Sequence, residues 1–214
     1  MRATKKATAE QLAALHGKKP ALAAAPVAGA APELSDVERA ELGQELIIAA
    51  TNGDIDEISR LIEAGANIDA KDHDGCTALM KAARNGHRET IQPLIDKGAK
   101  IDEKNKNGNT ALILAAVVGH IETVQLLINS SANIDEKDNN GGTALIWAAR
   151  NGNQEIVQLL INKGAKLDEK NNDGETALIW AKNKGHKDIV AALRAAKKQN
   201  GAKAVQQSVR GLNP

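Results

Sequence analysis

A repeat with a period of 33 residues constrains this chain more than any other feature. Glycines that would separate two helices recur at this interval, at Gly53, Gly86, Gly119, Gly152 and Gly185. Four Thr-Ala-Leu sequences keep the same interval and begin at Thr77, Thr110, Thr143 and Thr176. Periods of about 20–50 residues are typical of proteins that stack identical structural units. In such a protein each unit packs only against the units next to it, so a longer chain has more units and not one larger central core.

Each unit predicts two short helices placed back to back. In the stretch 141–168, Ala144, Leu145, Ala148 and Ala149 make an apolar stripe at helical spacing, and Ile156–Ile161 makes a second, broader one. Gly152 interrupts the chain between the two stripes, and Gly164 supplies a left-handed stop after the second. About thirty residues cannot bury both stripes alone, so each unit needs neighbours.

These residues resemble the ankyrin-repeat family. Its Gly-x-Thr-Pro-Leu-His opening is matched by GCTALM, GNTALI, GGTALI and GETALI, with Ala in place of Pro and a non-His residue in place of the His. The mid-repeat Gly-His and a closing Gly-Ala-x-x-Asp also recur. The resemblance covers roughly residues 42–193. It implies an all-α ankyrin-repeat solenoid of about five helix-turn-helix repeats with short β-hairpin-like loops.

We expect the repeat domain to span residues 34–199, in units of about 34–70, 71–103, 104–136, 137–169 and 170–199. Ser35 and Glu38 have the spacing of a capping box, which predicts that the first helix begins there. The first unit is more polar and the last has an Ala-rich second helix, as suits end units that face water. Asn200-Gly201 is expected to end the last helix, leaving residues 200–214 as a flexible C-terminal tail.

Residues 1–33 are expected to form a flexible basic Ala/Pro-rich tail, and a cleaved targeting segment is the alternative. Charge is uneven: residues 1–32 carry +4 and residues 194–214 carry +5, which leaves −8 on the rest of a chain whose total is +1. An acidic repeat region argues against nucleic-acid binding. No apolar run approaches the length of a membrane span. We therefore expect a cytoplasmic protein.

The chain offers few groups for chemistry. Cys76 is the only cysteine, so an intrachain disulfide is impossible. His87, His120 and His186 occupy the Gly-His position of the repeat, where the family resemblance implies a structural role. The sequence Asp72-His73-Asp74-Cys76 has residue types that bind metals, but the equivalent loops carry turn residues, so we interpret it as a turn. We expect no catalytic residues, no metal and no cofactor, and hence a protein that is not an enzyme.

Two positions depart from the repeat. Pro93 lies inside the second helix of its unit, where proline removes a backbone hydrogen bond, so a tolerated local defect or a hinge is expected there. Ser131 stands where the other units have glycine and is expected to carry a left-handed backbone.

The resemblance implies that a partner binds the hairpin tips and the concave groove of the first helices. Residues off the packing stripe are expected to face this groove. The predicted partner-binding residues are Lys81, Arg84, Leu114, Val117, Val118, Trp147, Arg150 and Trp180. They include the only two aromatic residues of the chain, and Trp and Arg are frequent interface hot spots. The alternative is that both indoles lie between repeats as packing.

The sequence therefore predicts a non-catalytic protein-protein interaction module that is a monomer on its own and binds another protein. A dedicated inhibitor or protector that occludes the active site of a partner enzyme is an alternative. An adaptor anchored by its basic tails is a second one.

Overall fold

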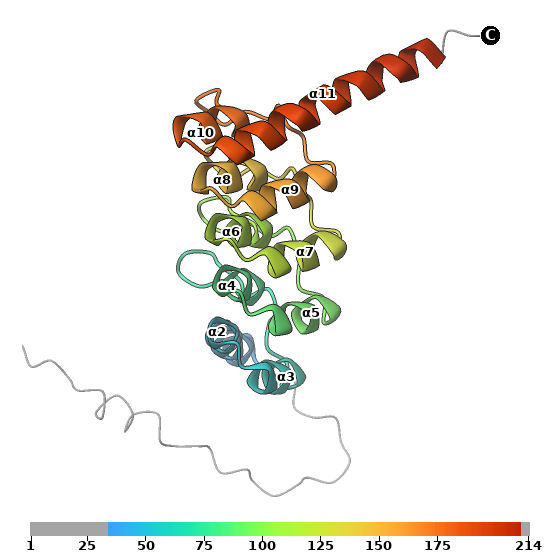
Figure 1. Ribbon diagram of the computed structural model, residues 1–214. Coiled ribbons are helices and arrows are strands. Elements are labelled where there is room, and N and C mark those ends of the chain that lie inside the picture. The colour runs from blue at the N-terminus through green and yellow to red at the C-terminus, as the bar shows by residue number, and fades with distance from the viewer. Residues whose placement is uncertain (1–33, 211–214) are drawn as a thin grey trace, which may run out of the picture. The chain divides into compact units, whose positions relative to one another are not determined.

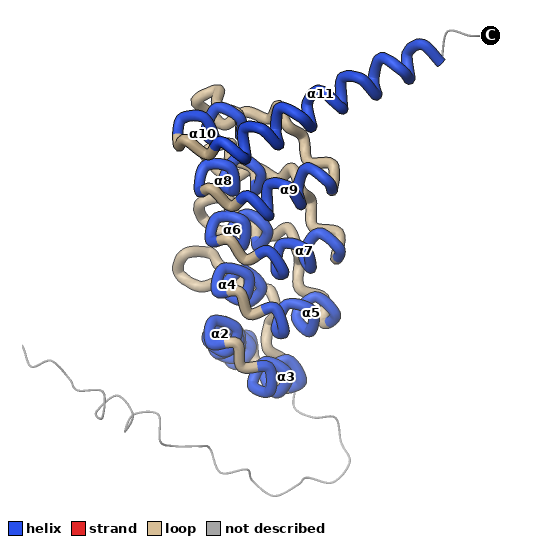
Figure 2. The backbone as a smooth tube through the Cα atoms, viewed as in Figure 1, coloured by secondary structure: helices blue, strands red, loops and turns tan. Residues whose placement is uncertain are grey.

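The computed structural model describes residues 34–210, which form helices joined by short loops and contain no strand (Figure 2). The helices form two layers (Figure 1). The inner helices are α2 (Asp36–Asn52), α4 (Ala78–Asn85), α6 (Ala111–Val118), α8 (Ala144–Asn151) and α10 (Ala177–Asn183). The outer helices are α3 (Ile55–Glu63), α5 (Arg88–Asp96), α7 (Ile121–Asn129), α9 (Gln154–Asn162) and α11 (Lys187–Arg210). Within each layer, consecutive helices contact one another, which confirms the predicted solenoid.

The repeated polar residues set where the inner helices begin and end. The hydroxyl of Thr143, for example, caps α8 by accepting a hydrogen bond from the Ile146 amide at 3.3 Å, and Thr77, Thr110 and Thr176 do the same for their helices. Gly152 ends α8 with a φ of 81°, a left-handed conformation that costs glycine little. The threonines therefore begin α4, α6, α8 and α10 as predicted, and the glycines end α2, α4, α6 and α8, whereas the C-cap of α10 is Lys184, the residue before Gly185.

Alanine allows the inner layer to pack closely. In each of the three middle units, the three inner-helix alanines and one leucine are at most 1% exposed; in α8 these are Ala144, Leu145, Ala148 and Ala149. Larger side chains from the outer helices complete the core, among them Leu94, Leu127 and Leu160, all at 0% exposure. This thin core explains how a chain without Phe or Tyr can fold.

The mid-repeat histidines join each unit to the one before it. A ring nitrogen of His87 lies 2.9 Å from the Thr51 carbonyl oxygen, His120 contacts the Arg84 carbonyl at 3.1 Å and His186 contacts that of Arg150 at 3.2 Å. Asn153, at the fourth such position, donates to the Ala116 carbonyl at 2.8 Å. In these contacts the three imidazoles satisfy carbonyls at the ends of inner helices.

The loops between units are also linked. Within one loop the Asp138 amide donates to the Gly142 carbonyl at 3.0 Å, closing a tight hairpin-like turn. Between loops, the Asn139 amide donates to the Asn107 carbonyl and the Asn172 amide to the Asn140 carbonyl, at 3.0 and 2.9 Å. The loop tips therefore form a continuous edge beside the inner helices.

The N-terminal end of the repeats begins as predicted, but the last helix does not end as predicted. Ser35 and Glu38 form the capping box of α2. Helix α11 continues through Asn200-Gly201 to Arg210, so the prediction that these residues end it is wrong. One glycine costs a helix only about 1 kcal/mol, and the Ala, Lys and Gln residues that follow are good helix formers. The predictions for residues 1–33 lie outside the described residues.

Pro93 and Ser131 are accommodated locally. Helix α5 contains Pro93 and continues to Asp96. Ser131 has a φ of 72°, the only positive value at a non-glycine position among the described residues, which confirms the predicted left-handed backbone. Among residues 34–210, no helix is both long and apolar enough to cross a membrane.

Candidate functional site

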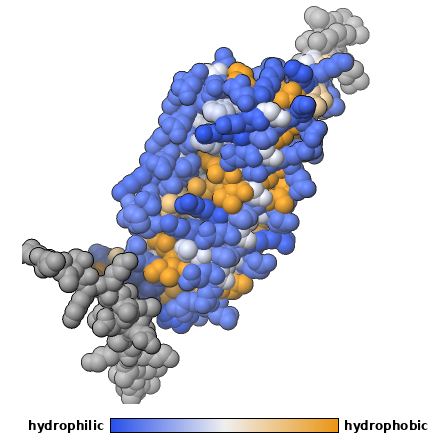
Figure 3. All heavy atoms as spheres, turned by 60° about the vertical axis from the view of Figure 1, so that its left-hand side comes forward, coloured by the Kyte–Doolittle hydropathy of each residue, from blue (hydrophilic) through white to orange (hydrophobic). Residues whose placement is uncertain are grey.

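The predicted site lies on the face that carries the inner helices and the loop tips. A space-filling view shows apolar side chains gathered in the middle of this face and bordered by polar ones (Figure 3). Two neighbouring cavities mark this region, one of about 290 Å³ and one of about 630 Å³. Trp147 and Asn140 line both of them, so the two cavities adjoin at these residues.

Trp147 is held in place by a buried carboxylate. Its indole Nε1 donates to the Asp138 Oδ2 at 2.8 Å, and Asp138 is only 7% exposed. The other carboxylate oxygen accepts hydrogen bonds from the amides of Gly142 and Asn140, at 2.7 and 2.9 Å. Both oxygens are therefore satisfied, and the indole cannot rotate without breaking its hydrogen bond to a buried carboxylate.

Gly142 makes room for this indole. A β-carbon at position 142 would lie 2.4 Å from Nε1 of Trp147, a distance at which something must shift. The equivalent loops carry Cys76, Asn109 and Glu175 instead. Glycine at position 142 therefore leaves free the space that the Trp147 indole occupies.

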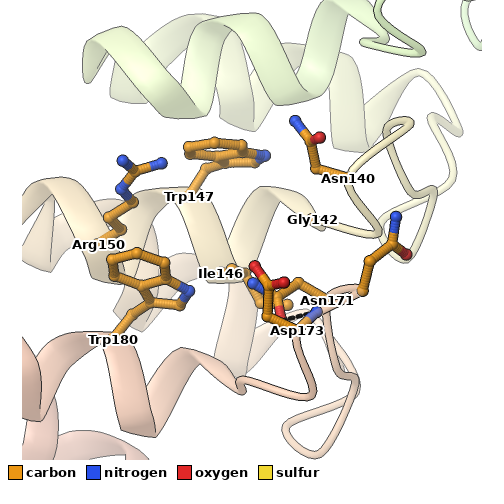
Figure 4. Close-up of a pocket in the computed structure, with 9 residues that line it drawn as sticks. Asn140, Gly142, Ile146, Trp147, Arg150, Asn171, Asp173 and Trp180 are labelled. Carbon is orange, nitrogen blue, oxygen red and sulfur yellow. Dashed lines mark hydrogen bonds between the residues drawn. The ribbon is translucent and has the colours of Figure 1, made fainter.

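Arg150 lies between the two indoles. Its guanidinium carbon is 4.8 Å from the ring centroid of Trp147 and 4.5 Å from that of Trp180 (Figure 4). Lys184 adds a second cation 5.9 Å from the Trp180 ring. Cation–π contacts at such distances are favourable, more so where water is partly excluded. We call Trp147, Arg150 and Trp180 the tryptophan cluster.

The tryptophan cluster is accessible, and Arg150 forms no ion pair within residues 34–202, although Asp173 lines the same cavity. All three side chains are half-buried, so neither indole is sealed between repeats. Within residues 34–202, no carboxylate forms an ion pair with Arg150. The smaller cavity is completed on its loop side by Asn140, Asn171 and Asp173, whose side chains Figure 4 shows opposite Arg150.

The structure brings together seven of the eight predicted residues. The tryptophan cluster lines the smaller cavity. Arg84, Leu114, Val117 and Val118 line the larger one with Trp147, and Val118 is 50% exposed. Lys81 lines neither of these two cavities.

Lys81 is instead paired with the loop of its own unit. Its ammonium lies 2.7 Å from Asp72 Oδ2, while the amides of Asp74 and Cys76 donate to Asp72 Oδ1. Burial would raise the pKa of Asp72, but the bonds from Lys81 and the two amides outweigh it and leave the pKa below its ordinary value. Asp72 and Asp138 hold their loops in the same way, with Lys81 and Trp147 as their respective partners.

The pairing of Asp72 with Lys81 explains the metal-binding residue types in the loop of the second unit. Ligand atoms of Asp72, His73 and Asp74 lie within 4.8 Å of one another. However, both oxygens of Asp72 already accept hydrogen bonds within the loop or from Lys81. The cluster is a loop-closing arrangement, and we assign no site to it.

Sequence reasoning missed the loop residues of the groove, among them Asn140, Gly142, Asn171 and Asp173, and the support from Asp138. A signal for Asp138 was present. In two units an aspartate stands nine residues before the inner-helix residue that was expected to face the groove: Asp72 before Lys81 and Asp138 before Trp147. The other two units have an asparagine there instead, Asn105 before Leu114 and Asn171 before Trp180.

Comparisons with known proteins agree with this architecture. A family model described as ankyrin repeats in three copies matches residues 46–138 and 122–207. An ankyrin repeat protein of Rickettsia felis is 46% identical over 46 residues, which are 22% of this chain and 73% of that protein. A second one from the same organism is 48% identical over 42 residues, which are 20% of this chain and 64% of that protein.

Proposed function

Because the chain belongs to the ankyrin-repeat family, whose repeats are generally protein-protein interaction modules and not enzymes, we propose that it binds a partner protein through its groove and loop tips. The tryptophan cluster is the centre of the proposed site. The observation that carries the proposal is the position of Arg150, which lies between two half-buried indoles without an ion-pair partner within residues 34–202.

This arrangement has the properties of an interface hot spot. Tryptophan and arginine dominate many interfaces, because they bury a large area and lose little conformational freedom when already ordered. Here Trp147 is fixed by Asp138, and Arg150 is fixed by the two rings. A partner would therefore meet a preformed surface.

The surroundings of the cluster favour one kind of ligand. Arg150 and Lys184 supply positive charge beside the indoles, while Leu114, Val117 and Val118 extend an apolar surface on the other side of Trp147. Asn140 and Asn171 border the smaller cavity with amide groups that can bond a polypeptide backbone. We infer that the preferred partner presents a carboxylate next to apolar side chains.

Capture of partners from a native extract on the immobilised full chain tests this proposal. Trp180→Ala should lower retention of the specific partner by tenfold or more, on the order of a hot-spot loss. Its melting temperature should fall only modestly, because the Trp180 indole, although half-buried and packed beside Arg150, makes no hydrogen bond in the described structure and lies in an end unit. Ile48→Ala is the matched control, since Ile48 holds the equivalent position in the first unit and lines neither cavity.

Equal retention by Trp180→Ala and the wild type would contradict the proposed site, as would an extract from which nothing specific is retained. The narrower hypothesis, an inhibitor of a partner enzyme, requires that the retained protein has an activity that stoichiometric addition of this chain suppresses.

A further inference from the structure

The two ends of the repeat stack carry opposite charge. The first unit, residues 34–70, has nine acidic and two basic residues, a net charge of −7. Residues 170–210 have nine basic and three acidic residues, a net charge of +6. The middle units, residues 71–169, are nearly neutral at −1. Since α2 and α11 lie at opposite ends of the stack (Figure 1), the charge is separated along its length.

The repeat itself shows which residues form the C-terminal end surface. Ile179 is 38% exposed, whereas its equivalents Met80, Ile113 and Ile146 are at most 3% exposed. This position is therefore covered by the following unit, and Ile179 is exposed because no further unit is stacked on it within residues 34–210. Lys182 is exposed at a second position of this kind, where the other four units carry an alanine at 0% exposure: Ala50, Ala83, Ala116 and Ala149.

This end surface keeps an apolar cavity. A cavity of about 390 Å³ lies between α10 and α11, with Ala181, Val190 and Ala191 among its apolar lining residues. Three cations, Lys182, Lys187 and Arg194, line the same cavity. Val190 is half-buried, whereas its equivalents in the other units are at most 1% exposed. The C-terminal end is therefore an apolar surface bordered by positive charge.

The N-terminal end surface is acidic at the matching positions. Glu45 is exposed, whereas its equivalents in the four later units are alanines at 0–1% exposure: Ala78, Ala111, Ala144 and Ala177. Glu57 takes a position where the later units have Thr90, Thr123, Ile156 and Ile189, all at most 2% exposed. In the later units the preceding unit covers these positions.

Two further features describe this end. Arg60 lies between the two glutamates, 2.6 Å from Glu57 and 3.8 Å from Glu45, and offsets part of their charge. The first unit also carries Val37 and Ile48, which at 67% and 60% are the most exposed large apolar side chains among the described residues. Val37 thus adds an exposed apolar group to the acidic first unit, whereas Ile48 holds the groove position that Lys81, Leu114, Trp147 and Trp180 hold in the later units.

We propose that the C-terminal end of one copy binds the N-terminal end of a second copy, head to tail. Lys182 and Arg194 of one copy would face Glu45 and Glu57 of the next, in the relation that each unit has to its neighbour. An end unit of a repeat protein requires only a hydrophilic outer surface to stay in solution. Here the two end surfaces also carry opposite net charges, and the C-terminal one contains an apolar cavity. These two features are complementary to the other end of a second copy of this chain.

The proposal differs from the monomer that the sequence predicted, because that prediction treated both ends as simple polar caps. A head-to-tail contact joins the C-terminal end of one copy to the N-terminal end of the other, so the resulting pair still has one free end of each kind. The assembly should therefore grow with concentration and should not stop at a dimer.

Sedimentation velocity of the full chain over a range of concentrations tests this. At low salt the average mass should rise continuously with concentration. In ~1 M NaCl, where the Debye length falls to about 3 Å, it should return to that of the monomer.

Charge reversal gives the sharper test. The variant Lys182→Glu/Arg194→Glu places acidic residues at the proposed contact on both ends, and the variant Glu45→Lys/Glu57→Lys places basic residues there on both ends. Each alone should associate at least about tenfold more weakly than the wild type, because like charges would meet at the contact. An equimolar mixture of the two should restore association, since every end then meets one of opposite charge.

The matched control is Glu122→Lys/Glu155→Lys, which makes the same change in net charge as the basic variant but in exposed residues of the middle units. It should associate as the wild type does. Residues 1–33 are present in all variants, so their charge contributes equally, and circular dichroism melts verify that each variant is folded.

A wild type that stays monomeric, a mixture that fails to associate or a closed dimer insensitive to these reversals would each overturn the proposal.

Discussion

At the scale of single residues, Asp138 determines how the groove is built. Its carboxylate accepts from two loop amides and from the indole of Trp147, so it joins the loop to the inner helix α8. The same position in the second unit is Asp72, which pairs with Lys81. Whether a groove position holds a fixed indole or a paired lysine therefore depends on residues in the adjacent loop.

Asp138→Ala should lower the free energy of unfolding by about 1–3 kcal/mol, because it leaves buried donors without an acceptor. Urea denaturation measures the loss, and the fluorescence of Trp147 should shift as its Nε1 gains access to water. Asp173→Ala, at an exposed loop position nearby, is the control and should change stability by less than about 0.5 kcal/mol. A neutral effect of Asp138→Ala would show that the bond does not hold the loop.

Ser131 is a second residue whose effect can be isolated. With φ at 72° it has the backbone that Gly98 and Gly164 adopt in the neighbouring units, where an added β-carbon would meet no atom within 4 Å. Ser131→Gly should stabilise the protein by about 0.5–1 kcal/mol, because the cost is one of backbone conformation alone. The reverse substitution, Gly164→Ser, should destabilise it by a similar amount in the same denaturation assay. Changes of the same sign in both variants would contradict this explanation.

At the scale of elements, lysines connect successive loops. Lys71, Lys104 and Lys137 each lie 2.7 Å from a glutamate 32 residues later, namely Glu103, Glu136 and Glu169. Each also donates to the backbone carbonyl 33 residues later, at 2.9–3.1 Å. The hydrogen bond from lysine lowers the pKa of each glutamate below 4.5, although partial burial opposes it.

This direction of shift sets the pH dependence. A carboxylate whose pKa is lower in the folded state stabilises the fold above its unfolded value, here 4.5, and loses that contribution as the pH falls through the folded value. The free energy of unfolding should therefore decrease below about pH 4.5. In the triple variant Glu103→Gln/Glu136→Gln/Glu169→Gln the decrease should be smaller, by about 0.2–1 kcal/mol per pair. Urea titrations at pH 7 and pH 3 measure it, and identical decreases in both proteins would count against the lysine contacts.

At the scale of the whole stack, each unit is stabilised by its neighbours, so the ends have less support than the middle. Helix α10 has Ile179 and Leu178 partly exposed, whereas Ile113 and Leu112 in α6 are 1% exposed. Stability in such proteins is approximately a sum over units and their interfaces.

Amide hydrogen exchange should therefore be slowest in α6 and α7 and faster in α10, when each segment is compared with its intrinsic rate. Measurement in dilute protein and ~1 M NaCl keeps the proposed association from covering the ends. Uniform protection along the stack would show that it unfolds as a single unit. Slower exchange of α10 at high concentration in low salt would instead support the head-to-tail contact.

The sequence by itself determined the repeat fold, because its signals are local and recur four or five times. Thr143 before an Ala-Leu pair and Gly152 after it define a helix through nearby backbone groups, and repetition removes the ambiguity of any one unit. The end of α11 was not determined in this way, since one glycine is a weak signal against good helix formers on both sides. The sequence also indicated which residues face the groove, because they depart from the packing stripe.

Only the tertiary structure decided how those groove residues behave. Trp147 and Lys81 hold equivalent positions, yet one is fixed by Asp138 at the groove centre and the other is paired with Asp72. Arg150 contacts indoles from two successive units, a relation that depends on the spacing and rotation between them. Such contacts join residues that are far apart along the chain or lie on different elements, so their geometry follows from how the units stack and not from the local pattern within one unit.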